Sequence, residues 1–377
     1  MVGRLQRREF FAFCVRVDKT FNRKGIATMK RRSFLNLAGA TAVGLGFPMM
    51  ARAQQAKRFD GITLRTNGYG GESTRVFREF VIKPLREETG LNVEIQDGSA
   101  SGAMTQVLAS PNNPPFDFVM GDSPNLPALI KAGLLAPVTV EQIPNIAKIR
   151  PSAREFGEFG VPYLTNAVVL TYNEKHVQTP LKSYKDLARP DLRDSIGMLS
   201  PENTGGILTL LGLAAAYGAT LDNMTPVFDA LRAMKGNIAS ATSSSVSLVQ
   251  QLEQEEVVAG PIFDGRVNNM RAKGLPMRKV IPDEGIFALY NTLSPLKTSK
   301  HLDAVYAYIN RVLTDEVLTE LMKAYRYAPV TDVPISADVA QEITINAETV
   351  NLLKPVDWTK VASMQGALIE QFKKALQ

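Results

Sequence analysis

Short runs of β-branched residues alternate along the chain with stretches of helical periodicity. The segments GITLRTN (61–67), NVEIQD (92–97) and FDFVMGD (116–122) have the composition of strands. Between the first two, residues 74–90 place apolar side chains on one helical face and end at Gly90, a common helix stop. This alternation is typical of an α/β fold, so we predict mainly parallel sheets flanked by helices.

Polar loops that contain glycine follow the predicted strands. Four of them span residues 67–73, 98–102, 121–125 and 200–206. At the carboxyl ends of parallel strands, such loops place backbone N–H groups and helix N-termini around one crevice. Glycine and serine also make ordinary turns and helix caps, which is the alternative for any single loop. The four loops together predict a ligand-binding crevice.

Longer apolar runs mark the middle of the chain. Residues 161–173 (VPYLTNAVVLTYN) have the pattern of one continuous buried strand, suited to a crossover between two lobes. EVVAGPIF (256–263) predicts another buried strand, and residues 283–295 return to extended character. We find no internal repeat and no low-complexity tract. One two-lobed unit is therefore the expected organisation.

A leader-like segment precedes this pattern. Residues 30–32 form a basic head, the run from Phe34 to Ala51 is apolar but too short and too glycine-rich for a comfortable membrane span, and ARA (51–53) is a small-residue cleavage pattern. RRSFL is similar to the twin-arginine export signature. We predict a signal peptide over 29–53, an upstream extension over 1–28, and a periplasmic protein of a Gram-negative bacterium; the alternative is a basic juxtamembrane anchor.

Removing the leader changes the charge balance. The full chain has 43 Lys+Arg and 37 Asp+Glu, a net charge of +6. Residues 1–53 hold 11 of the bases and 2 of the acids, so the remainder has 43 − 11 = 32 bases and 37 − 2 = 35 acids, or −3. This balance does not indicate nucleic-acid binding. The single cysteine, Cys14, also lies in this part, so the exported protein would have no thiol chemistry.

Several motifs together carry a family resemblance. In order along the chain, they are NGYGGES, DFVMGDSPNLPALIKAGLLAPV, VPYLTNAVVLTYN, LKSYKDLARPDLRDSIGMLSPENTG, GPIFDG, EGIFALYNTLSPLKTSKHLDAVYAYINRVL and YRYAPV. With these motifs the chain resembles the periplasmic solute-binding proteins of ABC importers, of the two-lobed type 2 that includes spermidine/putrescine-binding proteins. The resemblance implies two α/β lobes joined by hinge strands, with lobe 1 formed by 54–163 and 284–328 and lobe 2 by 164–283 and 329–377.

The resemblance also implies a mechanism and a set of site residues. A small molecule would be trapped as the lobes close and then delivered to the permease subunits by a monomeric protein without a cofactor. The expected ligand-binding residues are Tyr69, Ser99, Ser101, Asp122 and Ser123 in lobe 1, Thr165, Glu202, Asn203, Thr204, Phe263, Asp264 and Arg266 in lobe 2, and Tyr290 and Asn291 at the return crossing.

The sequence departs from the polyamine binders at positions that would grip an amine. Leu289 stands where such a binder has a tryptophan, Asn291 where it has an aspartate, and Gly205 where it has a second carboxylate beside Glu202. The sole tryptophan lies near the C-terminus, far from these motifs along the chain. Arg266 near a predicted helix start favours an anion. We therefore expect a carboxylate, a phosphonate or a modified amino acid, with a polyamine as the alternative.

Other kinds of site have weaker support. Tyr325 and Tyr327 could bind ferric iron, but alternating tyrosines favour packing at a crossover turn. His176 and His301 are isolated, so no metal site is expected. NGYGGES lacks the third glycine of a dinucleotide fingerprint, and no GxSxG or SxxK motif supports an enzyme on this scaffold. The serine cluster at 242–247 predicts a helix cap or a hydrogen-bonding wall.

Overall fold

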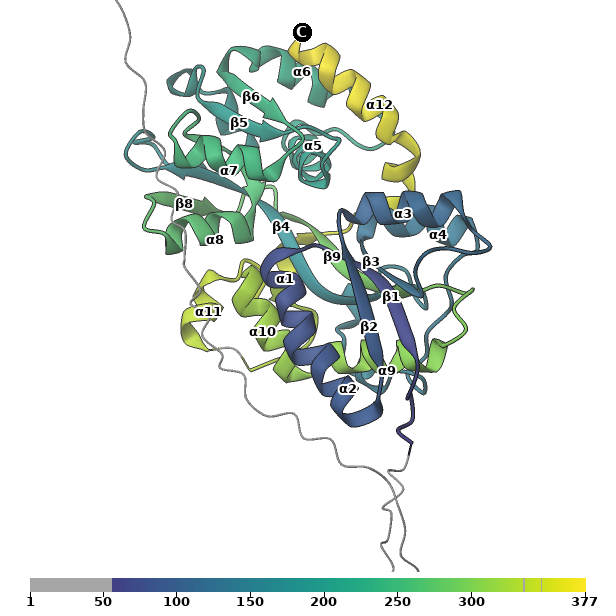
Figure 1. The fold of residues 1–377 in the computed structure, drawn as a ribbon. Helices are drawn as coiled ribbons and strands as arrows, with labels where there is room; N and C mark the ends of the chain where they lie inside the picture. Colours follow the sequence, from purple (N-terminus) through teal and green to yellow (C-terminus); the bar gives the residue numbers. More distant parts are fainter. Residues whose placement is uncertain (1–55, 335, 347) are drawn as a thin grey trace, which may run out of the picture. The chain divides into compact units, whose positions relative to one another are not determined.

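The computed structural model describes residues 56–334, 336–346 and 348–377 (Figure 1). The predicted leader (29–53) and the extension before it (1–28) lie outside the described residues. None of the described helices is long and apolar enough to cross a membrane.

The first strand–helix–strand unit has the predicted form. β1 (Thr63–Gly68) and β2 (Asn92–Asp97) pair in parallel. One helical run connects them, formed by α1 (Gly71–Val76), a π-helical turn (Phe77–Ile82) and α2 (Lys83–Thr89). Gly90 ends the run in the left-handed conformation. Pro84 is the second residue of α2. It has no N–H to donate to the carbonyl of Phe80 inside the π-helical turn, and its ring crowds that carbonyl, which favours the wider turn there.

A second set of strands and helices begins after residue 195. Its strands are β5 (Ile196–Leu199), β6 (Ile238–Thr242), β7 (Ala259–Phe263) and β8 (Met277–Val280), and its helices are α5 (Thr204–Tyr217), α6 (Thr225–Ala233), α7 (Ser245–Glu253) and α8 (Asp264–Ala272). β5 lies between β6 and β7 and runs parallel to both. α5 is apolar on all sides and almost wholly buried, as expected for a central helix.

Two long strands run between these sets side by side (Figure 1). β4 (Val161–Asn173) is buried along its whole length and pairs antiparallel with β9 (Ile286–Pro295). β3 (Phe118–Asp122) pairs antiparallel with β9, and β7, β8 and β10 (Ala328–Pro329) pair antiparallel with β4. The α/β fold is confirmed, but the larger sheet is mixed rather than mainly parallel. The antiparallel pairs all involve β4 or β9, whereas β5 pairs in parallel with β6 and β7.

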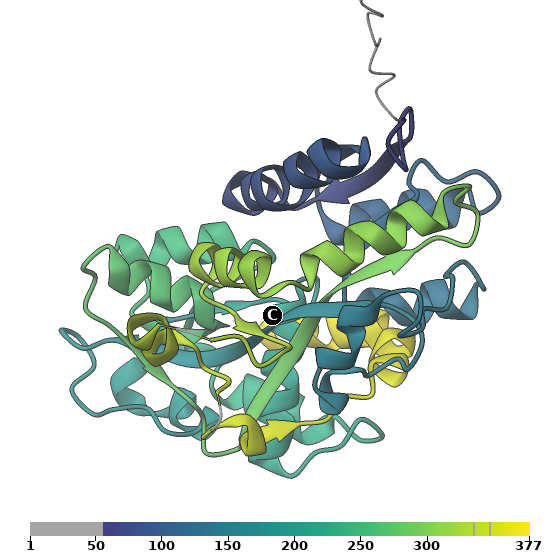
Figure 2. The same cartoon turned by 90° about the horizontal axis from the view of Figure 1, so that it is seen from below.

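The remaining elements complete the two sides of this sheet. They are α3 (Ala100–Ala109), α4 (Leu126–Lys131), α9 (Leu302–Val312), α10 (Asp315–Tyr325), α11 (Ala337–Glu342), β11 (Leu353–Lys354) and α12 (Trp358–Leu376). α9 and α10 pack against the α1–α2 run on one side, and against β9 and β4 respectively on the other (Figure 2). β11 pairs in parallel with β9.

Hydrophobic side chains form separate cores in the two sets of elements. The first set is β1 to β3, α1 to α4, α9 and α10, and the second set is β5 to β8 and α5 to α8. The first core contains Leu64 and Tyr308, and the second contains Tyr184 and Leu213. Residues 329–345, which we expected in the second lobe, contribute Val330, Val333, Val339, Ile343 and Ile345 to the first core. α12 packs on α6 and also on α4, so the C-terminal helix contacts both sets of elements.

Candidate functional site

A cavity of about 530 Å³ lies where the two sets of elements meet at β4 and β9. Ten of the fourteen predicted site residues line it: Tyr69, Ser99, Ser101, Asp122, Glu202, Asn203, Thr204, Phe263, Arg266 and Asn291. Seven further lining residues were not among the predicted ligand-binding residues: Ala100, Tyr163, Asn166, Ser245, Leu289, Tyr325 and Tyr327. Tyr163 stands at a shift of register in β4, a bulge that strand composition does not reveal.

Four predicted site residues do not line the cavity. On β9, successive side chains point to opposite faces, so Leu289 and Asn291 line the cavity while Tyr290 is buried on the other face. The same alternation turns Thr165 away on β4, where its hydroxyl donates to the Leu289 carbonyl at 3.0 Å, and brings Asn166 in.

Ser123 and Asp264 serve the framework behind the cavity. The Ser123 Oγ accepts the Tyr290 N–H at 2.9 Å and donates to Glu155 at 2.8 Å. The Asp264 carboxylate is 1% exposed and accepts the Gly265 N–H at 2.9 Å. Burial raises the pKa of Asp264 to about 6, although the charge of Lys279 lowers it.

Four helices begin at the cavity wall. Ser99 caps α3, Asn203 caps α5 and Ser244 caps α7, each by accepting a backbone N–H of the first turn. α8 begins directly after Phe263. Each of these four helices contributes a lining residue from its first turn or its cap. Unpaired N–H groups at a helix start carry partial positive charge, so the wall attracts anions.

Gly205 allows the start of α5 to approach the strands closely. A Cβ at this position would lie 2.6 Å from the Leu199 Cδ1 and 3.0 Å from a ring carbon of Phe263. A carboxylate-bearing side chain does not fit at Gly205 without moving these groups. The position that the resemblance associates with a second amine-binding carboxylate is therefore closed by packing.

The ionisable groups of the cavity are few. Glu202 forms an ion pair with Lys373 of α12 at 2.7 Å, and this contact lowers its pKa. Asp122 is half-buried, and its removal from bulk water raises its pKa. It accepts hydrogen bonds from the Tyr69 hydroxyl at 2.9 Å and the Asn291 amide at 2.8 Å. Arg266 forms no ion pair or hydrogen bond with another described residue.

Four tyrosines line the same cavity. The rings of Tyr325 and Tyr327 stack with centroids 5.5 Å apart, as expected from packing at a crossover turn, and the Tyr325 hydroxyl is buried without a partner among the described residues. Burial raises the pKa of Tyr69, Tyr163, Tyr325 and Tyr327. These phenols therefore stay protonated at neutral pH and act as hydrogen-bonding groups rather than as phenolate ligands.

The tryptophan is closer to the cavity than its position in the sequence indicates. Trp358 is 2% exposed and packs in one hydrophobic cluster with Leu289, a lining residue, and with Leu208 of α5. It therefore stands behind the cavity wall.

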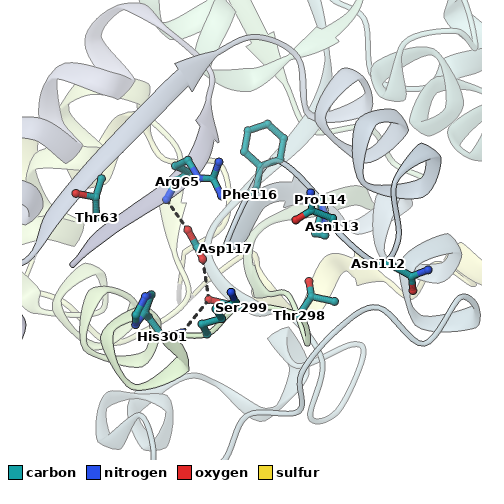
Figure 3. Close-up of a pocket in the computed structure, with 11 residues that line it drawn as sticks. Thr63, Arg65, Asn112, Asn113, Pro114, Phe116, Asp117, Thr298, Ser299 and His301 are labelled. Atoms are coloured by element: carbon teal, nitrogen blue, oxygen red, sulfur yellow. Dashed lines mark hydrogen bonds between the residues drawn. The ribbon is translucent and has the colours of Figure 1, made fainter. Parts of the chain in front are cut away.

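A second, smaller pocket lies within the first set of elements (Figure 3). Its volume is about 270 Å³, and its lining includes Arg65, Asp117, Ser299 and His301. Asp117 is occupied by structural contacts, because it accepts the Arg65 N–H at 2.8 Å and the Ser299 hydroxyl at 2.9 Å. All lining residues belong to one lobe in the predicted division, so a ligand here would not bridge two lobes. The larger cavity is the candidate site.

Comparison with known proteins agrees with this fold. The family model described as "Bacterial extracellular solute-binding protein" matches residues 81–347, more than half of the chain. An uncharacterised protein of Haemophilus influenzae is 23% identical over 253 residues, which cover 65% of this chain and 71% of the relative.

Three solved structures share the fold. An ABC transporter structure from Clostridium perfringens has 24% identity and a TM-score of 0.74, over 84% of this chain and 100% of its own. The spermidine/putrescine substrate-binding protein PotD of Streptococcus pneumoniae has 20% identity and a TM-score of 0.68, over 84% and 100%. The binding protein AgtB of A. tumefaciens R10, in complex with agropinic acid, has 15% identity and a TM-score of 0.65, over 84% and 99%.

The family match carries more weight than these distant structural similarities, which concern the fold. All residues that line the cavity, except Tyr69, lie within the matched residues. The chain therefore belongs to the bacterial extracellular solute-binding proteins.

Proposed function

We propose that this protein captures a small solute with an acidic group, a carboxylate or a phosphonate, and delivers it to an ABC permease. Modified amino acids belong to this class. The observation that carries the proposal is Arg266, a guanidinium that lines the cavity and has no ion pair among the described residues. Arginine is always charged at neutral pH and binds planar or tetrahedral anions through several N–H groups.

The surroundings of Arg266 favour the same ligand. Four helix starts direct partial positive charge into the cavity. Of the two carboxylates that line it, Glu202 is already paired with Lys373. An acidic group on the solute would compensate the charge of Arg266 and the helix starts together.

A polyamine is the alternative that the family resemblance raises. It would need carboxylates for its ammonium groups, and the cavity offers Asp122 as the only lining carboxylate without an ion pair in the described part of the chain. Leu289 and Gly205 stand at positions where the resemblance implies a tryptophan and a carboxylate. Each missing charge-assisted hydrogen bond weakens binding by about 1.5–3 kcal/mol.

The structural relatives do not decide between these ligands. PotD is described as a spermidine/putrescine-binding protein, whereas AgtB is seen with an organic acid, and both share the fold of this chain. The side chains of the cavity must therefore decide, and they support the acid.

Binding would be coupled to movement of the lobes. Asp122 and Tyr69 approach the cavity from the first set of elements, while Arg266 and Thr204 approach it from the second. A solute that contacts both sides stabilises the closed arrangement by its extra contacts there. The leader-like segment at 29–53 supports export to the periplasm, where a monomer would meet its permease.

The proposal is tested by calorimetric titration of the purified protein with organic acids, phosphonates, amino acids and polyamines. Acid-bearing solutes should bind, and Arg266→Gln should weaken them by about tenfold to a hundredfold, because one or more charge-assisted bonds are lost. Arg266→Lys should keep part of the affinity.

Arg271→Gln is the matched control, since Arg271 is an exposed arginine of the same helix that does not line the cavity. Its affinity should equal that of the unaltered protein. Binding of polyamines but of no acid, or equal affinity of the Arg266→Gln variant for acids, would contradict the proposal.

A further inference from the structure

A chain of hydrogen bonds connects Asp122 to two amides on the crossover strands. The Asp122 Oδ1 accepts from the Tyr69 hydroxyl at 2.9 Å and from the Asn291 Nδ2 at 2.8 Å. The Asn291 Oδ1 in turn accepts from the Asn166 Nδ2 at 3.0 Å. All four residues line the cavity, and they come from β3, β9, β4 and the loop after β1.

The ionised carboxylate determines how both amides are oriented. A carboxylate has acceptors only, so Asn291 must turn its NH₂ group toward Asp122 and its oxygen toward Asn166. Asn166 must then donate to that oxygen, which leaves its own Oδ1 as a free acceptor. This side of the cavity therefore presents a negative charge and an amide oxygen, and it suits a hydrogen-bond donor.

Arg266 belongs to the same cavity and carries the opposite charge. Asp122 and Arg266 form no ion pair with each other or with another residue in the described ranges. The charge of Asp122 raises the pKa of Tyr325 and Tyr327, and the charge of Arg266 lowers it. This stacked pair of tyrosines is therefore close to both charges. Asp122 has hydrogen-bond donors but no counter-charge, and Arg266 has no counter-charge either, so a ligand that brings an opposite charge to each would compensate both.

We propose that the solute is a zwitterion whose acidic group meets Arg266 and whose ammonium group meets Asp122 and Asn166. This inference rests on the proposed function and narrows its substrate class to amino acids, including non-α amino acids and aminophosphonates. Asn291 is a positioning residue that orients the acceptors. A plain acid leaves Asp122 without a cation, and a polyamine places a cation near Arg266, so both bind more weakly.

Matched triads of compounds test the charge pattern at a constant number of carbon atoms. The triads are γ-aminobutyrate with butanoate and butylammonium, β-alanine with propanoate and propylammonium, and aminoethylphosphonate with ethylphosphonate and ethylammonium. Calorimetric titration should show that, in at least one triad, the zwitterion binds at least about tenfold tighter than either singly charged partner, as expected for one added charge-assisted contact.

The Asp122→Asn variant should remove this preference. It is nearly isosteric, so the zwitterion should lose at least about tenfold in affinity while the plain acid loses none, and the ratio between them should approach one. Asn291→Leu should reduce the same ratio without reducing binding of the acid. The Asn291→Leu variant serves as the test if Asp122→Asn does not fold.

Asp229→Asn is the control for the change in charge, because Asp229 is exposed on α6 and lies outside the cavity. Its ratio should equal that of the unaltered protein. Plain acids that bind as tightly as their zwitterions would overturn this inference and leave the proposed function standing. Failure of all triads while polyamines bind would overturn both, as would an absence of binding throughout the panel.

Discussion

At the scale of one residue, Asp264 makes the stability of the protein depend on pH. Burial raises its pKa from about 3.8 to about 6 in the folded protein, so the folded state holds the proton more tightly than the unfolded chain. Its contribution to stability is full below the unfolded pKa and is lost as the pH rises through about 6. Lowering the pH from neutral toward 5 should therefore increase the free energy of unfolding by about 1 kcal/mol through this group.

Denaturant unfolding of the protein and of Asp264→Asn at several pH values measures this term. Glu155, whose pKa is also raised to about 7, contributes in the same direction in both proteins, so the difference between them isolates Asp264. The variant should have a smaller gain in stability on acidification. Parallel pH profiles would mean that Asp264 titrates normally.

The candidate site was partly predictable at the residue scale. The loops and caps that place Ser99, Asn203 and Arg266 are local features, and these residues do line the cavity. Thr165 was predicted to line the cavity, but its neighbour Asn166 does so instead. Because β4 is buried on both faces, its sequence has no alternation of polar and apolar residues that would distinguish the two positions. Tyr325 and Tyr327 line the cavity where they pack closely against Gly265 of α8. This contact joins segments that are far apart in the sequence, so local patterns do not reveal it.

At the scale of elements, two helix ends offer a matched comparison. Gly90 after α2 and Gly133 after α4 both have left-handed backbones, with φ of 82° and 66°. A Cβ at Gly133 meets no atom within 4 Å, whereas one at Gly90 would lie 3.0 Å from the Asp60 Cα. The two positions therefore separate backbone strain from steric crowding.

Alanine at each position should lower stability by different amounts. Gly133→Ala should cost about 1 kcal/mol from backbone strain alone. Gly90→Ala should cost about 2 kcal/mol or more, because the backbone of Asp60 must also move. Midpoints of chemical unfolding compare the two variants directly, and equal losses would show that the contact with Asp60 relaxes easily.

The sequence was informative about elements and less so about their pairing. Strands at β1, β2, β3 and β4 follow from β-branched composition, and the helix before Gly90 follows from its periodicity. The antiparallel pairing of β3 with β9 brings Asp122 and Asn291 together although 169 positions separate them in the sequence. Local patterns carry no record of such a partner, so the parallel arrangement was the default expectation and the mixed sheet was not foreseen.

At the scale of the whole molecule, α12 extends from the second core to the edge of the cavity. Its residue Lys373 neutralises Glu202 there. Lys373→Gln would leave an uncompensated negative charge on the cavity wall, and acidic solutes should then bind more weakly. The pair is substantially exposed, so we expect a loss of no more than about fivefold.

Lys374→Gln is the control, since it removes the same charge from the next residue. Lys374 pairs with Glu370 on its own helix and does not line the cavity. Titration of both variants with the same acid should show a weaker affinity for Lys373→Gln only. Equal affinities would indicate that the field of Glu202 does not reach the solute.

The buried indole behind the cavity provides the protein with an optical reporter of its own. Trp358 is the only tryptophan of the chain, so all indole emission comes from one place, between a cavity-lining leucine and α5. Indole emission shifts with the polarity and packing around the ring, and binding that moves α5 relative to β9 should change it. A saturable change of fluorescence, absent in Trp358→Phe, would then report solute capture without any label.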